Sequence, residues 1–168
     1  MANSAISFEE IMFSIMSATQ DTFKSYMQID ILAGKVEKEI EPVDSDVIGI
    51  VGVASDRVGY IIFATELESA TVIAKELLMI DEADEESIRD AICELANNIA
   101  GAFKSKYHSQ YGSVALGLPL VVSGKLRPLA DMTPQQSAPG LNVKCNGVTI
   151  PFVSMDRNIS FRVMVYMG

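Results

Sequence analysis

The sequence has few of the residues on which metal sites, disulfide frameworks and nucleic-acid surfaces depend. Its 168 residues include two cysteines, Cys93 and Cys145, and one histidine, His108. The cysteines have no metal-ligand spacing and form no disulfide framework, and a single histidine cannot build a His-rich metal site. Lys and Arg number 13 against 22 Asp and Glu, which gives a formal net charge of −9. Nucleic acid and anionic membranes need clustered basic residues, so neither is an expected partner.

Long apolar runs are also missing. No stretch of about 18 apolar residues could form a membrane-spanning helix, and the start MANSAISFEE lacks the basic and apolar segments of a signal peptide. Hydrophobic residues make up 49% of the chain, which indicates a packed globular protein. The length suits one domain with a full core. We therefore expect a single domain over residues 1–168, located in the cytoplasm.

Residues 85–107 carry the clearest helical pattern in the chain. Read at 100° per residue, they place six apolar residues on one side, at the spacing of a buried stripe. These residues are Ile88, Ile92, Leu95, Ile99, Ala102 and Phe103. The pattern predicts a long amphipathic helix around which the rest of the chain is organised.

The opposite side of this helix carries Asp90, Glu94, Asn97 and Gly101. An asparagine in mid-helix, as at Asn97 and Asn98, costs about 0.5–0.7 kcal/mol relative to alanine, and Gly101 costs roughly another 1 kcal/mol. A helix that accepts these costs indicates that polar groups and an accessible backbone are needed on this face. A solvated surface without a specific role accounts for the pattern equally well.

The remaining chain alternates between helical and strand spacing. A helix is expected over the first 28 residues, with the apolar side Phe8, Ile11, Ile15, Thr19, Phe23 and Tyr26. Val- and Ile-rich segments at 29–40, 46–55 and 57–66 predict three strands, the last two joined as a hairpin. Helical spacing returns at 68–80, with an inward side of Val72, Ala74, Leu77 and Leu78.

The C-terminal part is expected to be mostly strand. Residues 114–124 predict one strand, and 127–140, which hold three prolines, predict an irregular loop or arm. Asn146-Gly147 suits a type I′ turn, so 141–145 and 148–153 are expected to form a hairpin. A turn at 156–158 then leads into a final strand over 159–167. The expected fold class is α+β, a mainly antiparallel sheet of about six strands covered by three helices.

A weak internal repeat relates the first helix to residues 85–107. A shift of 80 residues lays Phe23-Lys24-Ser25 on Phe103-Lys104-Ser105. Ser14 and Ser17 then stand at the positions of Glu94 and Asn97. A match this short between amphipathic helices also arises by chance. If the repeat is real, only its second copy carries the Glu and the Asn.

The spacing Asp90-x3-Glu94-x2-Asn97, followed 22 residues later by Pro119, resembles the signature helix of the CheC/CheX/FliY family. Members of that family are phosphatases that dephosphorylate the response regulator CheY. One such motif in a chain of this size, with a degenerate first helix, is similar to the CheX branch and unlike CheC, which carries two. Pro119 lies slightly closer to Asn97 than in the family pattern, which puts the helix-to-strand loop in question.

The resemblance implies a function for each residue of the motif. Asn97 would orient the water that attacks the aspartyl phosphate of a CheY-like regulator, and Glu94 would form a salt bridge with the regulator's active-site lysine. The residues implied in partner binding or support are Asp90, Asn98, Gly101 and Pro119, with Gly101 providing clearance for the partner. The protein would need no metal or cofactor of its own, because Mg²⁺ would be carried by the regulator.

The resemblance also implies a homodimer joined through β structure, whose strands associate or exchange between subunits. The apolar segments 148–153 and 159–167 agree with this, since an exposed edge of that kind needs to be covered. Pro151 fits an edge or a bulge better than a central strand. A helix that shields the edge is the alternative.

Two function classes remain at this point. One is an enzyme that hydrolyses an aspartyl phosphate and so terminates chemotaxis signalling. The other is a non-catalytic module of the same fold that binds a response regulator or a flagellar motor component. The joint presence of Glu94 and Asn97 favours the enzyme.

Overall fold

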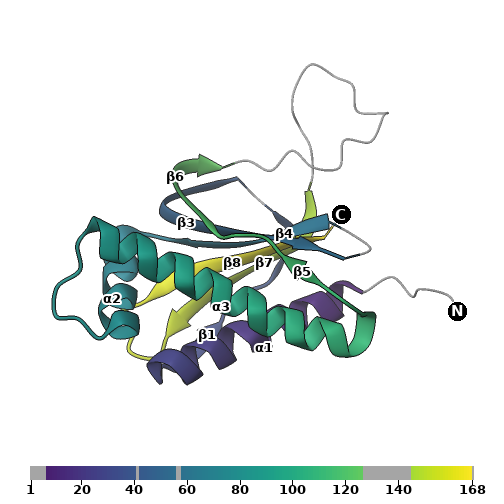
Figure 1. Cartoon of the computed structure of the whole chain (residues 1–168), viewed down its shortest axis with the longest axis horizontal. Helices are drawn as coiled ribbons and strands as arrows, with labels where there is room; N and C mark the ends of the chain where they lie inside the picture. The colour runs from purple at the N-terminus through teal and green to yellow at the C-terminus, as the bar shows by residue number, and fades with distance from the viewer. Residues whose placement is uncertain (1–6, 41, 56–57, 127–144, 168) are drawn as a thin grey trace, which may run out of the picture.

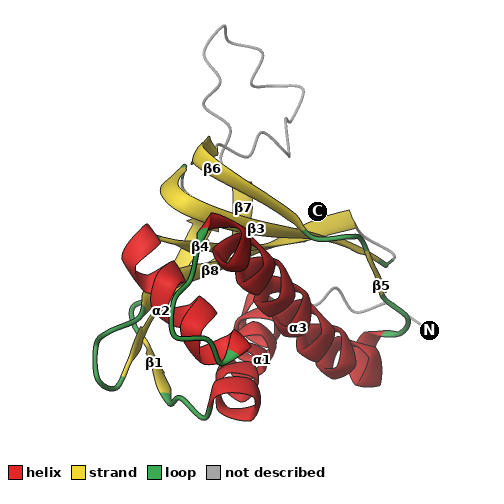
Figure 2. Ribbon diagram, turned by 60° about the vertical axis from the view of Figure 1, so that its left-hand side comes forward, coloured by secondary structure: helices red, strands yellow, loops and turns green. Residues whose placement is uncertain are grey.

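The computed structural model describes residues 7–40, 42–55, 58–126 and 145–167, which form three helices and one antiparallel sheet (Figure 1). The helices α1 (Phe8–Met27), α2 (Leu67–Leu78) and α3 (Glu85–Tyr111) all cover the same face of the sheet (Figure 2). The expected α+β class is therefore confirmed. The arm expected at 127–140 and residues 1–6 of the first expected helix lie outside the described residues.

The sheet has eight strands in the order β1-β7-β8-β4-β3-β5, with β2 also paired to β7 and β6 also paired to β3. All pairs are antiparallel. The strands are β1 (Ile31–Ala33), β2 (Glu37–Ile40), β3 (Val43–Ala54), β4 (Val58–Thr65), β5 (Ala115–Leu116), β6 (Leu120–Leu126), β7 (Cys145–Ser154) and β8 (Ser160–Met167). The expected hairpin of 46–55 and 57–66 is present as β3 and β4.

Two segments expected as single strands are each divided in two. The break between β1 and β2 lies opposite Pro151, which has no N–H to continue the ladder; Gly34 donates instead to the Pro151 carbonyl at 2.7 Å. The break between β5 and β6 is a bulge, because three residues of this segment stand opposite two of β3. Leu118 at this bulge is pushed outward and is 93% exposed.

The type I′ turn expected at Asn146-Gly147 is wrong. Both residues lie inside the continuous strand β7, where Asn146 pairs with Glu39 of β2 and Gly147 pairs with Tyr166 of β8. Pairing on both sides outweighs the local turn preference of Asn-Gly. The turn expected at 156–158 is confirmed, and there the Asp156 carboxylate accepts a hydrogen bond from the Asn158 N–H at 3.1 Å.

The pairing pattern repeats within the chain. One half consists of α1 followed by β1 to β4, and the other consists of α3 followed by β5 to β8. The helix α2 connects the two halves and belongs to neither. In each half, the first two short strands pair with the hairpin of the other half: β1 and β2 pair with β7, and β5 and β6 pair with β3. The strands β4 and β8 pair at the centre of the sheet. The helices α1 and α3 occupy equivalent places and pack side by side (Figure 2). This arrangement agrees with the weak repeat between their sequences. It also makes β7 and β8 internal strands, so the exposed apolar edge expected for them is wrong.

The main core lies between the helices and the sheet. The predicted stripe of α3 is buried at Ile88, Ile92, Leu95, Ile99 and Phe103, but Ala102 is only half-buried. The core side of α2 is formed by Ala70, Ile73 and Ala74, whereas the expected Val72, Leu77 and Leu78 are only partly buried. Tyr26, expected in the core side of α1, is 55% exposed. No helix in the described ranges combines the length and apolarity needed to cross a bilayer.

The two long helices begin at side-chain caps. Ser7 and Glu10 form a capping box at α1, and the Asp84 carboxylate accepts from the Ser87 N–H at 2.8 Å at the start of α3. The hydrogen bonds from Ser87 hold the pKa of Asp84 below its ordinary value. The cap therefore stabilises the fold at neutral pH, and this contribution is lost as the pH falls through the lowered pKa.

Candidate functional site

At the position of Glu94 and Asn97, the inner side of α3 packs closely against the sheet. Directly beneath it, a Cβ at Gly49 of β3 would lie 3.0 Å from the Ala96 Cβ and 3.3 Å from Ile92 Cγ2. Only glycine allows α3 to approach the strand this closely. Glu94 and Asn97, one helical turn apart, are thus presented by a buried and closely packed segment of helix.

The outward residues of the predicted motif lie where the helical pattern placed them. Asp90, Glu94 and Asn97 are exposed, and Asn98 and Gly101 are half-buried. Within the part of the chain that the structure describes, Glu94 forms no salt bridge with another residue of the chain. Its carboxylate is therefore available to a cationic partner.

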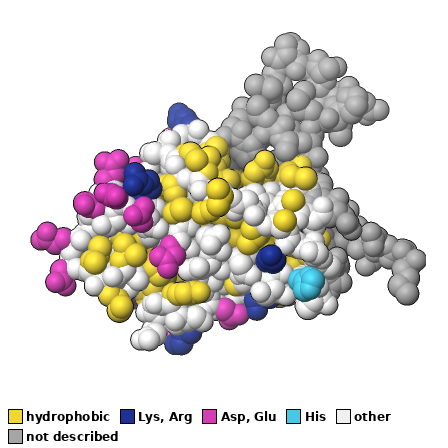
Figure 3. Space-filling view, in the orientation of Figure 1, with side chains coloured by type: hydrophobic (Ala, Val, Ile, Leu, Met, Phe, Trp, Pro, Cys, Tyr) yellow, Lys and Arg dark blue, Asp and Glu magenta, His cyan; other side chains and the backbone are white. Residues whose placement is uncertain are grey.

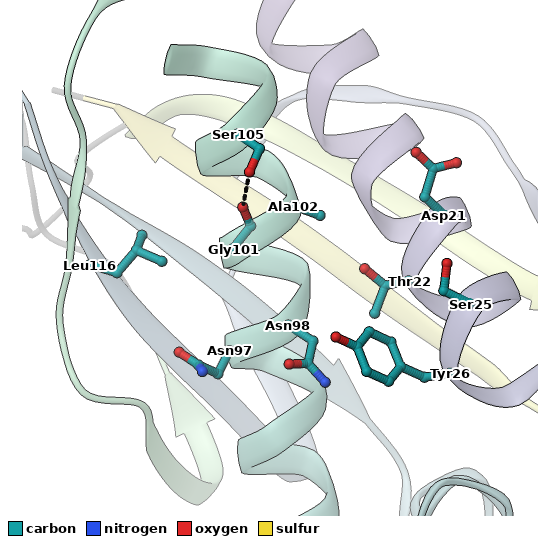
Figure 4. A pocket seen from close by; sticks show the side chains of 10 residues that line it. All are labelled: Asp21, Thr22, Ser25, Tyr26, Asn97, Asn98, Gly101, Ala102, Ser105 and Leu116. Carbon is teal, nitrogen blue, oxygen red and sulfur yellow. Dashed lines mark hydrogen bonds between the residues drawn. The ribbon is translucent and has the colours of Figure 1, made fainter. Parts of the chain in front are cut away.

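A groove runs beside this face, between α1 and α3, with a volume of about 370 Å³ (Figure 4). Its lining consists of Asp21, Thr22, Ser25 and Tyr26 from α1, Asn97, Asn98, Gly101, Ala102 and Ser105 from α3, and Leu116 from β5. The side chain of Asn98 points toward Tyr26 of α1, and the side chain of Asn97 points toward the β5 side (Figure 4). Asn97 therefore lies where the groove meets the outward face of the helix.

The wall that α1 contributes to this groove was not found from the sequence. Tyr26 was placed in the core, and Ser14 and Ser17, the positions equivalent to Glu94 and Asn97, do not line the groove. Helical spacing could have indicated only that Asp21, Ser25 and Tyr26 share a side of α1. Pro119 belongs to the bulge between β5 and β6, is half-buried and does not line the groove either.

Two features of the groove are costly for the free protein. Asn98 Nδ2 is buried without a hydrogen-bond partner, and among the described residues it is the one buried side-chain nitrogen or oxygen in that condition. Gly101 sits in mid-helix although a Cβ there would meet nothing within 4 Å. Packing among the described residues therefore does not require a glycine at this position.

Charge changes sign along α3, which carries Glu85, Glu86, Asp90 and Glu94 in its first half and Lys104 and Lys106 toward its end. Acidic side chains gather over the end of the molecule that carries α2 and the start of α3 (Figure 3). Arg89 is 3.8 Å from the Asp90 carboxylate, but both side chains are more than half exposed, so this pair contributes little. At the far end of the groove, Lys106 Nζ and Asp21 Oδ2 are 2.9 Å apart and join α3 to α1.

The described residues contain no group of three or more His, Cys, Asp and Glu side chains that could hold a metal ion. Cys93 is free and half-buried on α3. The exposed groups at the site are a carboxylate, an amide and the open backbone at Gly101. Such a set can position a water molecule and bind a partner.

The family model described as "Chemotaxis phosphatase CheX" matches residues 47–152, which is more than half of the chain. The chain belongs to the CheX family. The matched region contains all of α3 and therefore the complete Glu94 and Asn97 face. No curated protein matches the chain significantly.

Several solved structures share the fold. The chemotaxis protein CheX from Desulfovibrio desulfuricans is 20% identical, with a TM-score of 0.76 over 95% of this chain and 99% of that chain. A chain of the CheX-CheY-BeF3-Mg complex from Borrelia burgdorferi is 20% identical, with a TM-score of 0.71 over 97% of this chain and 99% of that chain. FliY from Thermotoga maritima is 15% identical, with a TM-score of 0.60 over 98% and 93% of the two chains.

Proposed function

We propose that this CheX-family protein hydrolyses the aspartyl phosphate of a CheY-like response regulator in the cytoplasm and so terminates chemotaxis signalling. In this proposal Asn97 orients the attacking water and Glu94 docks on the active-site lysine of the regulator. The observation that carries the proposal is the joint exposure of Glu94 and Asn97, one turn apart, on a helix that is closely packed against the sheet. The CheX-CheY complex of the Borrelia burgdorferi relative supports the class of partner.

The chemistry of the substrate suits such a sparse site. An acyl phosphate is already prone to hydrolysis, and phosphoryl transfer passes through a loose transition state that needs little help from a strong base. Holding one water in line with the scissile P–O bond therefore supplies much of the acceleration. The Asn97 amide can accept a hydrogen bond from that water while remaining uncharged. A carboxylate in its place would be repelled by the phosphoryl group.

The metal of the reaction is assigned to the regulator. Mg²⁺ bound beside the aspartyl phosphate would neutralise the developing charge, so this protein has to supply only the water-orienting amide and the docking carboxylate. Asp90 continues the acidic side of the docking face by one turn beyond Glu94.

The proposal is tested by steady-state phosphate release from a CheY-type receiver domain held in acetyl phosphate and Mg²⁺. A small amount of this protein should raise the rate of phosphate release in proportion to its concentration. Tight binding of the phosphorylated receiver without any increase in phosphate release would instead assign the protein to the non-catalytic class.

The first helix supplies a matched control. Ser14 and Ser17 occupy the positions equivalent to Glu94 and Asn97, are half-buried and do not line the groove. Replacing both by alanine should leave turnover unchanged, because we expect one active face per chain. Steady-state kinetics of the double variant measure this. A large loss of turnover would show that α1 carries a second catalytic face.

We also propose that the protein is a homodimer joined through the edges of its sheet. Among the described residues, β6 pairs on one side only, and Leu120 at its start is 57% exposed. An exposed strand edge with apolar side chains needs to be covered. Sedimentation equilibrium at micromolar concentration should give twice the 18.2 kDa of one chain. A mass equal to one chain would contradict the dimer.

A further inference from the structure

The groove between α1 and α3 has the features of a binding surface that is empty in the free protein. It opens beside Asn97, and it is lined by hydroxyl groups, amides and a tyrosine ring. Its charges are largely compensated, because Lys106 Nζ lies 2.9 Å from the Asp21 carboxylate. Thr22 Oγ1 is also satisfied, since it donates to the Ala18 carbonyl at 2.7 Å. A neutral, partly apolar occupant suits this lining better than an ion.

Two residues identify what the occupant must provide. The Nδ2 atom of Asn98 is buried and has no acceptor, and leaving such a donor unpaired is unfavourable, so an occupant with an acceptor oxygen would be favoured if the amide turns into the groove. At Gly101 the space above the helix backbone is open, so a chain can approach the helix closely there. An acceptor oxygen on a chain that lies close to the helix is what a polypeptide main chain offers.

We propose that this groove binds a main-chain segment of the same regulator whose phosphoryl group is presented to Asn97, and that the Asn98 amide turns into the groove and donates through Nδ2 to a carbonyl oxygen of that segment. This inference rests on the proposed function. Asn97 itself lines the groove, so a receiver domain seated on Asn97 is already in contact with its rim. The exposed ring of Tyr26 forms the opposite wall and supplies apolar contact area. The groove therefore determines the orientation and affinity of the regulator, and not the chemical step.

Gly101→Leu is the most direct test. A Cβ at this position would meet no described residue within 4 Å, so the substitution is tolerated at the helix backbone, and the rest of the leucine side chain projects into the space that the segment needs. Binding of a CheY-type receiver loaded with beryllofluoride and Mg²⁺ is measured by titration in an Asn97→Ala parent, so that any displacement of Asn97 has no influence. We expect the Kd to rise by about tenfold or more. Ser109→Leu introduces the same side chain at an exposed position of α3 outside the groove and should leave the Kd unchanged.

Two further variants test the groove without adding bulk to α3. Tyr26→Ala removes an exposed ring from the opposite wall, and Asn98→Ala removes the unpaired donor. Each should raise the Kd several-fold while thermal unfolding shows a fold as stable as the parent. With Asn97 restored, both should raise KM and leave kcat near the wild-type value.

The outcomes separate this inference from the proposed function. If the parent binds the loaded receiver and Gly101→Leu binds it equally well, the groove assignment is overturned and the phosphatase proposal stands. If the groove variants lower kcat without changing the Kd, the groove acts on Asn97 and not on the partner, which also overturns the assignment. If the parent shows no binding that depends on beryllofluoride, the proposed function fails and this inference fails with it.

Discussion

Asn97→Ala is expected to abolish nearly all of the accelerated hydrolysis of the aspartyl phosphate. Without the amide, the attacking water has no partner on this protein that holds it in line with the phosphorus atom. Loss of positioning of this kind costs roughly 100-fold in rate. Single-turnover decay of the phosphorylated receiver, with this protein in excess, measures the effect on the chemical step apart from binding.

The fold of the Asn97→Ala variant should be unaffected. Asn97 is exposed, and alanine is a better helix former by about 0.5–0.7 kcal/mol, so the free energy of unfolding should be equal or slightly higher. Urea denaturation checks this. Decay at the wild-type rate by a correctly folded variant would contradict the water-orienting role of Asn97.

Glu94→Lys is expected to weaken binding and turnover together. The substitution replaces an exposed carboxylate that has no salt bridge among the described residues, and it places a cation opposite the regulator's lysine. Like charges brought together at an interface cost several kcal/mol, so we expect the Kd to rise by at least about tenfold. The loss should diminish as salt is added, because salt screens exposed charges.

A matched charge reversal separates the docking role of Glu94 from the effect of net charge. Glu76 is exposed on α2, so Glu76→Lys changes the net charge by the same amount away from the proposed docking face. Its Kd should remain near the wild-type value at moderate salt. Equal weakening by both substitutions would mean that Glu94 acts through general electrostatics and has no specific contact.

The parts of the fold that the sequence predicted correctly depend on local periodicity. In α3, buried residues and exposed polar residues alternate with helical spacing, which is a property of the helix itself. The face with Glu94 and Asn97 could therefore be assigned to solvent before the structure was known. Alternation along a strand has the same local character, and in β8 the alternate residues Phe161, Val163 and Val165 lie in the main core.

The errors concern features that are decided by distant residues. Asn146-Gly147 has the composition of a hairpin turn, but β2 and β8 pair with it on both sides and keep it in a strand. The break between β1 and β2 follows from Pro151 in another strand. The groove wall on α1 was missed for the same reason, because Tyr26 becomes part of a site only where α1 packs beside α3.

The most direct test of the phosphatase assignment is the decay of a phosphorylated CheY-type receiver after removal of the phosphodonor. The decay is followed with and without a sub-stoichiometric amount of this protein, so that each molecule must act many times. The account predicts complete and faster loss of the phosphoryl group with the wild-type protein, and decay at the spontaneous rate with Asn97→Ala. Unchanged or slower decay in the presence of wild-type protein that binds the receiver would contradict it.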